Sequence, residues 1–157
     1  MTTCVEGIAA RPATNGIMIR KAQVLWSAVA IAGSSAISAK SGMLTEAPYS
    51  LATRFAPGKG RSPEELLAAA HAGCFTTALA FSLQVAGYAP AELSTEASVT
   101  CEPDGPGYRI SCSALTLRAK VPNLTRDTFE TMAWHAVNNC PISKVLRAQI
   151  RLDAKLL

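Results

Sequence analysis

The chain has 157 residues, a length that fits one domain and leaves enough chain to bury a hydrophobic core. About half of the residues are apolar (49%) and 17% are charged, which is ordinary for a globular protein. The formal charge of +4 is mild, and the basic residues are scattered with no interleaved aromatic residues. This pattern argues against a nucleic-acid-binding protein.

The cysteine count is odd and follows no pairing pattern. The five cysteines stand at positions 4, 74, 101, 112 and 140, without a CxxC pair or a Cys/His cluster. The two histidines, His71 and His135, cannot complete a structural zinc site of the usual spacing. Such a count suits a reducing compartment better than a secreted disulfide scaffold, so we expect a cytoplasmic protein without metal or organic cofactor.

The N-terminal part of the chain predicts a leader and then a first sheet. Residues 1–16 contain turn-forming pairs and no apolar periodicity, which predicts a loose leader before a single domain over 17–157. β-branched and aromatic residues then favour a pair of strands at 18–27 and 33–40, with a third strand near 48–52.

A secretory signal peptide is the alternative interpretation of the first predicted strand pair. Arg20 and Lys21 precede a short apolar run and a group of small residues, as in a signal sequence. Gln23 and Ser27 interrupt that run, which favours the strands. No stretch of the chain is expected to be long enough to span a bilayer.

The clearest predicted element is a long helix that begins after Ser62. Ser62 is the expected N-cap, Pro63 occupies the first helical position, and Glu65 completes a capping box. The helix runs to Gly87 and is apolar nearly all round, so we expect it to be buried on most sides. Gly73 would permit close approach of another backbone.

The remainder of the chain predicts a hairpin, two helices and a last strand. Strands at 93–102 and 108–120 flank the turn-forming sequence PDGPG. A helix over 126–138 follows, and Cys140-Pro141 opens a short helical turn before an alternating C-terminal strand. This order predicts an α+β protein with mostly antiparallel sheet.

Two cysteines are candidates for chemistry. Cys74 lies within the long helix among apolar neighbours, where a buried cysteine with only a packing role is the usual interpretation. Cys140 precedes Pro141 and is the expected N-cap of the short helix, where free N–H groups and the helix dipole favour a thiolate. A cap without chemical function is the alternative. Spacing alone does not decide between these interpretations.

Other polar residues are equally ambiguous. Arg54 and Glu64 flank a turn, either as surface charges or as an arginine that stabilises a thiolate and a carboxylate that orients it. His71 lies one turn before Cys74, where it could reach the same pocket, serve core packing or lie at an exposed polar edge. Cys101 and Cys112 lie in the hairpin and are expected to be packing residues, with Cys4 a thiol in the leader.

Taken together, these segments resemble the OsmC/Ohr family of osmotically inducible and organic hydroperoxide resistance proteins. The sequences that carry the resemblance are TRF at 53–55, SPEELLAAAHAGCF at 62–75 and NCPISKVL at 139–146. The resemblance extends from about residue 17 to the end, and the TRF and AHAGC sequences favour the OsmC branch.

The resemblance implies an intertwined homodimer, in which mostly antiparallel sheets wrap long central helices and two active sites lie at the interface. It implies that Cys74 is the peroxidatic and Cys140 the resolving cysteine, and that Arg54 and Glu64 assist. The implied activity is reduction of organic hydroperoxides through a Cys74–Cys140 disulfide, which an external dithiol, such as a lipoyl group, reduces again. No membrane or nucleic-acid partner is expected.

A geometric argument agrees with a site shared between subunits. Glu64 and Cys74 are ten residues apart, so about 15 Å along one continuous helix. If Arg54 and Glu64 serve a thiolate at Cys74, they must therefore reach a partner subunit's cysteine, or the helix must be broken between Glu64 and Cys74. Two other functions stay open from sequence: a thiol–disulfide oxidoreductase, and a non-catalytic dimeric stress protein that keeps only the fold.

Overall fold

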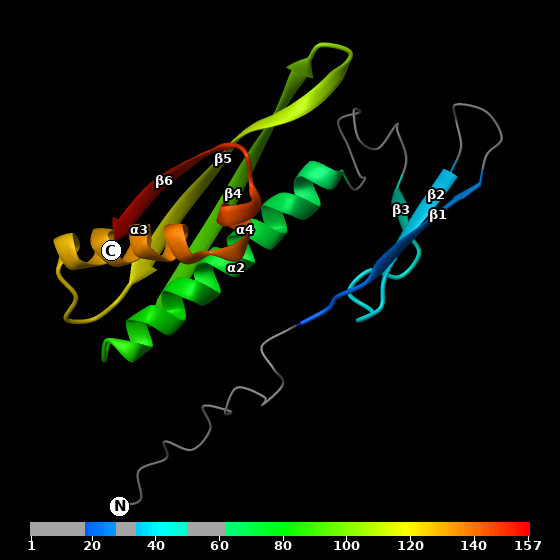
Figure 1. Cartoon of the computed structure of the whole chain (residues 1–157). Helices are drawn as coiled ribbons and strands as arrows, with labels where there is room; N and C mark the ends of the chain where they lie inside the picture. The colour runs from blue at the N-terminus through cyan, green and yellow to red at the C-terminus, as the bar shows by residue number, and fades with distance from the viewer. Residues whose placement is uncertain (1–17, 28–33, 50–61) are drawn as a thin grey trace, which may run out of the picture. The chain divides into compact units, whose positions relative to one another are not determined.

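The computed structural model describes residues 18–27, 34–49 and 62–157 (Figure 1). Internal contacts divide the chain into two compact units at residues 50 and 51. The predicted leader, 1–16, lies outside the described residues, and the single domain expected over 17–157 stays a prediction.

The first unit contains a small antiparallel sheet. Its strands are β1 (Ala22–Ser27), β2 (Ser34–Ala39) and β3 (Ala47–Tyr49), in the order β1-β2-β3. β1 pairs with β2 along its whole length, from Ala22 opposite Ala39 to Ser27 opposite Ser34. The predicted strand pair is therefore confirmed. Of the third predicted strand, residues 50–52 lie outside the described residues.

The long helix α2 (Pro63–Val85) opens the second unit as predicted. The Ser62 hydroxyl accepts a hydrogen bond from the Glu65 backbone N–H at 3.0 Å, which satisfies one of the free donors of the first turn. At the other end Gly87 adopts a φ of +86°, a conformation that ends helices and that glycine adopts without strain.

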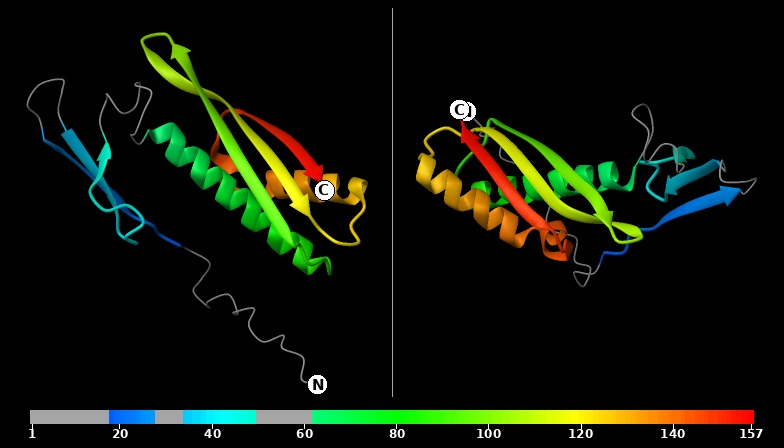
Figure 2. Two further views of the ribbon diagram at one scale, coloured as in Figure 1. Left: turned by 180° about the vertical axis from the view of Figure 1, so that it is seen from behind. Right: turned by 90° about the horizontal axis from the view of Figure 1, so that it is seen from above.

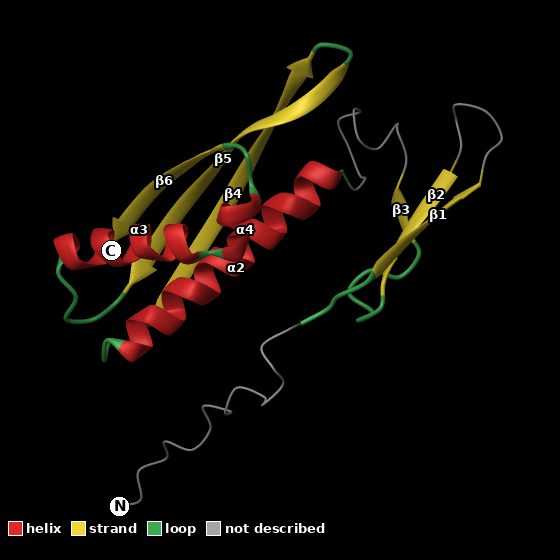
Figure 3. Ribbon diagram, in the orientation of Figure 1, coloured by secondary structure: helices red, strands yellow, loops and turns green. Residues whose placement is uncertain are grey.

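The other elements of this unit form a sheet and two further helices (Figures 1 and 3). Strands β4 (Glu92–Asp104) and β5 (Gly107–Lys120) are antiparallel, and β6 (Gln149–Leu156) lies parallel to β5. Helices α3 (Arg126–Asn139) and α4 (Pro141–Val145) form the crossover between β5 and β6, which a parallel pair requires.

The core lies between this sheet and the helices, which cover one of its faces (Figure 2). The exposed and half-buried residues of β4 and β6 alternate, because only one side of each strand is covered. The core is formed by fully or nearly fully buried side chains of α2, β5 and α3: Phe75, Leu79, Leu83, Leu115, Leu117, Ala119, Phe129, Ala133, Ala136 and Val137. The α+β class and the long central helix are as predicted.

The expectation about membrane spans was wrong in one respect. Helix α2 has 23 residues and a mean hydropathy of 1.6, so by length and composition alone it could cross a bilayer. Its inner face, His71, Phe75, Leu79 and Leu83, is buried against the rest of the unit, as in the core helix of a folded domain. The opposite face is open: Phe81 is 61% exposed and Val85 is 72% exposed.

Candidate functional site

Two thiols from distant segments meet beneath the short helix α4. Cys74 lies half-buried in the middle of α2, while Cys140 is completely buried between α3 and α4. Cys140 ends α3, and Pro141 then occupies the first position of α4, as the sequence predicted. The Cys140 thiol lies close enough to Cys74 to affect the ionisation of its sulfur, and neither cysteine is in a disulfide.

The surroundings of Cys74 favour its protonated form. Burial raises the pKa of the Cys74 thiol, and the hydrogen bond and charge repulsion from Cys140 raise it further. The backbone N–H of Ile142, in the first turn of α4, lowers this pKa by donating to the sulfur. Within the described part of the chain, no cationic side chain contributes to the shift. A reactive thiolate at Cys74 therefore needs positive charge from elsewhere.

A buried histidine links the three elements around the thiols. Nδ1 of His71 lies 2.7 Å from the Ser113 hydroxyl of β5, and Nε2 lies 2.8 Å from the Ser143 hydroxyl of α4. His71 has no exposed surface. The interpretation of His71 as a core residue is therefore the correct one, but its two serine partners were not predicted. The available signal was the position of His71 on the buried face with Phe75 and Leu79, where a polar group needs partners.

The histidine should make stability depend on pH. Burial lowers the pKa of His71 from its ordinary value near 6.5, so the folded protein resists a proton that the unfolded chain accepts. We expect the free energy of unfolding to fall below about pH 6.5, with His71 contributing up to about 1.4 kcal/mol per pH unit. The free energies of unfolding of the protein and of His71→Gln, measured with urea, should change differently with pH below about pH 6.5 and in parallel above about pH 7.5. A parallel dependence on pH over the whole range would contradict this expectation.

Of the two predicted assisting residues, the structure describes only Glu64, and it places Glu64 far from the Cys74 of the same chain. Glu64 is half-buried in the first turn of α2, ten residues before Cys74, and Arg54 lies outside the described residues. Since α2 is one continuous helix from Pro63 to Val85, the alternative of a broken helix is excluded. Glu64 and Cys74 are therefore separated by about 15 Å along the helix axis.

Two of the other cysteines lie in the β4–β5 hairpin and are free thiols. In the β4–β5 hairpin Cys112 faces Thr100 and Cys101 faces Ile110, with an irregularity between Thr100 and Cys101. Cys101 and Cys112 are therefore not opposite each other. Cys4 lies outside the described residues.

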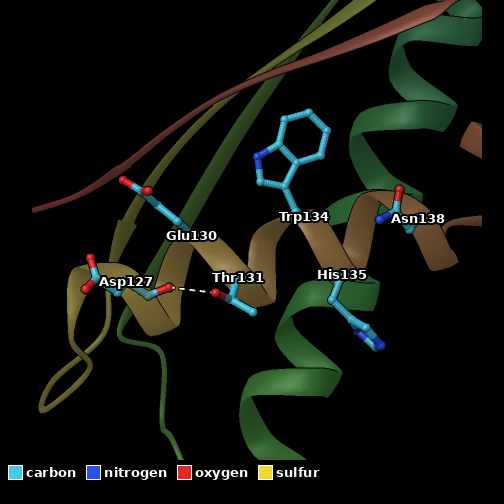
Figure 4. A pocket seen from close by; sticks show the side chains of 6 residues that line it. All are labelled: Asp127, Glu130, Thr131, Trp134, His135 and Asn138. Carbon is cyan, nitrogen blue, oxygen red and sulfur yellow. Dashed lines mark hydrogen bonds between the residues drawn. The ribbon is translucent and has the colours of Figure 1, made fainter.

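A depression on α3 and a metal site are two alternatives to this site. On α3 a shallow depression opens to solvent (Figure 4), lined by Asp127, Glu130, Thr131, Trp134, His135 and Asn138. All six come from one helix, and Trp134 and His135 point in opposite directions, so no reactive groups converge there. Among the described residues no group of three His, Cys, Asp or Glu side chains could hold a metal ion.

The glycine in α2 faces open space rather than a neighbouring backbone. A Cβ atom on Gly73 would meet no heavy atom within 4 Å among the described residues. The close approach predicted there is therefore not made within the described part of this chain. Gly73 lies instead on the exposed face of α2, with Thr77 and Phe81.

Known proteins are similar to this chain in sequence and in fold. A family model described as OsmC-like protein matches residues 56–155. Peroxiredoxin OsmC of Escherichia coli (strain K12) is 39% identical over 137 residues, which cover 87% of this chain and 96% of that protein. An organic hydroperoxide resistance protein of Xanthomonas axonopodis pv. citri is 32% identical over 102 residues, covering 64% and 70% of the two chains. The crystal structure of OhrB of Bacillus subtilis, an organic hydroperoxide resistance protein, superposes with a TM-score of 0.62 at 25% identity, over 86% of this chain and 98% of that one.

Proposed function

The chain belongs to the OsmC-like family, in its OsmC branch, and is a cysteine-based peroxidase; we propose that it reduces organic hydroperoxides through a Cys74–Cys140 disulfide. The observation that carries this proposal is the proximity of the Cys140 thiol to Cys74, although the two residues come from different helical segments. Thiols that lie so near each other need only a small movement to form a disulfide. The names of the relatives support an organic hydroperoxide as substrate.

The reaction proceeds in three balanced steps. The Cys74 thiolate attacks the outer peroxide oxygen, the O–O bond breaks, and the alkoxide takes a proton and leaves as an alcohol. The Cys140 sulfur then attacks the Cys74 sulfenic acid, so that the S–S bond forms, the S–O bond breaks, and water leaves with the Cys140 proton. An external dithiol, such as a lipoyl group, reduces the disulfide by exchange through a mixed disulfide.

Arg54 and Glu64 complete the proposed site as helpers of the thiol. Burial raises the pKa of Cys74, so the first step requires a cation that stabilises the thiolate and the departing oxygen. Arg54 supplies this charge in the proposal, and Glu64 holds its guanidinium. Since Glu64 cannot reach Cys74 along one unbroken helix, the pair serves the Cys74 of a partner subunit.

The partner in this proposal is a second copy of the same chain. The open face of α2, which includes Gly73, Phe81 and Val85, supports a homodimer in which this apolar surface is covered. We expect light scattering at micromolar concentration to give twice the mass of the 16.5 kDa chain. A monomer under those conditions would contradict both the dimer and the shared site.

The proposal extends to the cellular location of the protein. A cytoplasmic peroxidase is supported by the odd, unpatterned cysteine count, because a reducing compartment keeps such thiols free. No membrane or nucleic-acid partner is proposed.

The decisive experiment is a single-turnover reaction. One equivalent of cumene hydroperoxide is added to the reduced protein, and the products are mapped by mass spectrometry after alkylation of the free thiols. We expect one equivalent of alcohol and a disulfide linking Cys74 to Cys140. A protein that exchanges disulfides but leaves the hydroperoxide intact would be an oxidoreductase of another kind, and the proposal would fail.

A further inference from the structure

His71 is a buried residue to which the proposed mechanism assigns no role. His71 lies one turn before Cys74 on α2 and binds Ser113 of β5 with one ring nitrogen and Ser143 of α4 with the other. A neutral imidazole has one donor and one acceptor nitrogen, and a serine hydroxyl can serve either. The three side chains therefore form one satisfied network across three elements, and no buried polar side-chain atom in the described residues lacks a partner.

Helix α4 has few other attachments. It consists of five residues, none of them fully buried, and Cys140 makes no side-chain capping bond at its N-terminus. Ile142 packs against the core. The hydrogen bond between Ser143 and His71, at 2.8 Å, joins a side chain of α4 to helix α2. An element so short and so exposed depends on this contact for a fixed position.

The position of α4 matters because it determines what Cys74 meets. Cys140 precedes the first residue of α4, and the N–H of Ile142 in the same turn donates to the Cys74 sulfur. A shift of α4 would move the resolving sulfur away from its partner. Disulfide formation tolerates little misplacement, because the two β-carbons must come within about 4.5 Å of each other.

We propose that His71 is a positioning residue for the second chemical step: through Ser143 it holds α4 where the Cys140 sulfur can attack the Cys74 sulfenic acid. The inference rests on the proposed peroxidase mechanism and assigns a separate residue to disulfide closure. It does not place His71 in contact with the peroxide. The first step needs only Cys74, the peroxide and a cation, so loosening α4 should leave that step nearly unchanged.

Two opposing effects at Cys74 support this separation of the steps. The Ile142 N–H lowers the Cys74 pKa, whereas the Cys140 thiol raises it. Both groups move with α4, so their opposite effects on the Cys74 pKa offset each other in part when α4 is displaced. Their effects on formation of the disulfide do not offset each other, because that step requires the Cys140 sulfur itself.

The test compares the two steps in single-turnover experiments with cumene hydroperoxide. Ser143→Ala should consume the peroxide at a rate within about twofold of wild type, but should form the 74–140 disulfide at least about tenfold more slowly. Its Cys74 should accumulate as sulfenic acid and, with excess peroxide, as sulfinic acid. Ser143→Thr keeps the hydroxyl and should restore closure. Thr95→Val is the matched control, because it removes a 2.7 Å hydrogen bond between α2 and β4 that does not involve α4.

Two histidine variants give an independent measurement. Asn at position 71 retains a polar atom near Nδ1, on the Ser113 side, whereas Gln retains one near Nε2, on the Ser143 side. Closure should therefore be faster in His71→Gln than in His71→Asn. Equal closure in wild type and Ser143→Ala, or equal slowing of both steps, would overturn the positioning role. If wild type itself forms no 74–140 disulfide, the proposed function fails instead.

Discussion

Cys74→Ser should abolish peroxide consumption, with a loss of at least about a thousandfold in turnover. The substitution exchanges one atom of a half-buried side chain, so the fold should persist. A serine hydroxyl near neutral pH is a far weaker nucleophile than a thiolate and cannot form a stable sulfenic acid. The rate of cumene hydroperoxide loss in the presence of excess dithiol, compared with that of wild type, measures the effect.

Controls for this prediction are available in the same chain. Cys101 and Cys112 lie in the β4–β5 hairpin and are half-buried, as Cys74 is. Cys101→Ser and Cys112→Ser should therefore keep full turnover while removing a thiol from a similar environment. Full turnover in Cys74→Ser, or its loss in either hairpin variant, would show that the peroxidatic thiol has been assigned wrongly.

Elements defined by local chemistry were predicted well from the sequence. Ser62 and Pro63 begin α2, and Gly87 ends it, because capping and positive φ depend on residues next to each other in the chain. The same holds for Cys140 and Pro141 at the start of α4. The resemblance added the pairing of Cys74 with Cys140, which no local rule supplies, and the structure brings these two thiols together.

Features that depend on distant partners were not predicted. The serines bound by His71 lie on β5 and α4, and nothing near His71 in the sequence identifies them. The parallel pairing of β6 with β5 is likewise set by the packing of α3 and α4 between them in the chain, not by the alternating pattern of β6. For the same reason the roles of Arg54 and Glu64 stay proposals, because the proposed site includes a second subunit.

The raised pKa of Cys74 connects these observations. Taken alone, the described part of the chain favours a protonated, unreactive thiol, because burial and Cys140 act in that direction. A peroxidase needs the opposite state. In the proposed mechanism Arg54 of the dimeric site supplies the cation, so formation of the dimer would activate the enzyme.

Cys140→Ser should separate the chemical steps in a different way. Without a resolving thiol, Cys74 should react with about one equivalent of hydroperoxide and then stop as sulfenic acid, or proceed to sulfinic acid in excess peroxide. Cys140 is completely buried within the hydrophobic core, and serine is close to it in size, so the fold should tolerate the change. Mass spectrometry of Cys74 after one and after ten equivalents of cumene hydroperoxide measures the outcome. Continued turnover would show that Cys140 is not the resolving residue.

Cys140→Ala extends this test to the ionisation of Cys74. The hydrogen bond and charge repulsion from Cys140 both raise the Cys74 pKa, so their removal should lower it relative to wild type. Serine keeps a hydroxyl that can accept the hydrogen bond, so Cys140→Ser should lower the Cys74 pKa less than Cys140→Ala. Thiolate absorbance measured against pH gives this order directly. A Cys74 pKa that is unchanged in Cys140→Ala would mean that the two sulfurs are not in contact in solution, and the disulfide chemistry would lose its geometric basis.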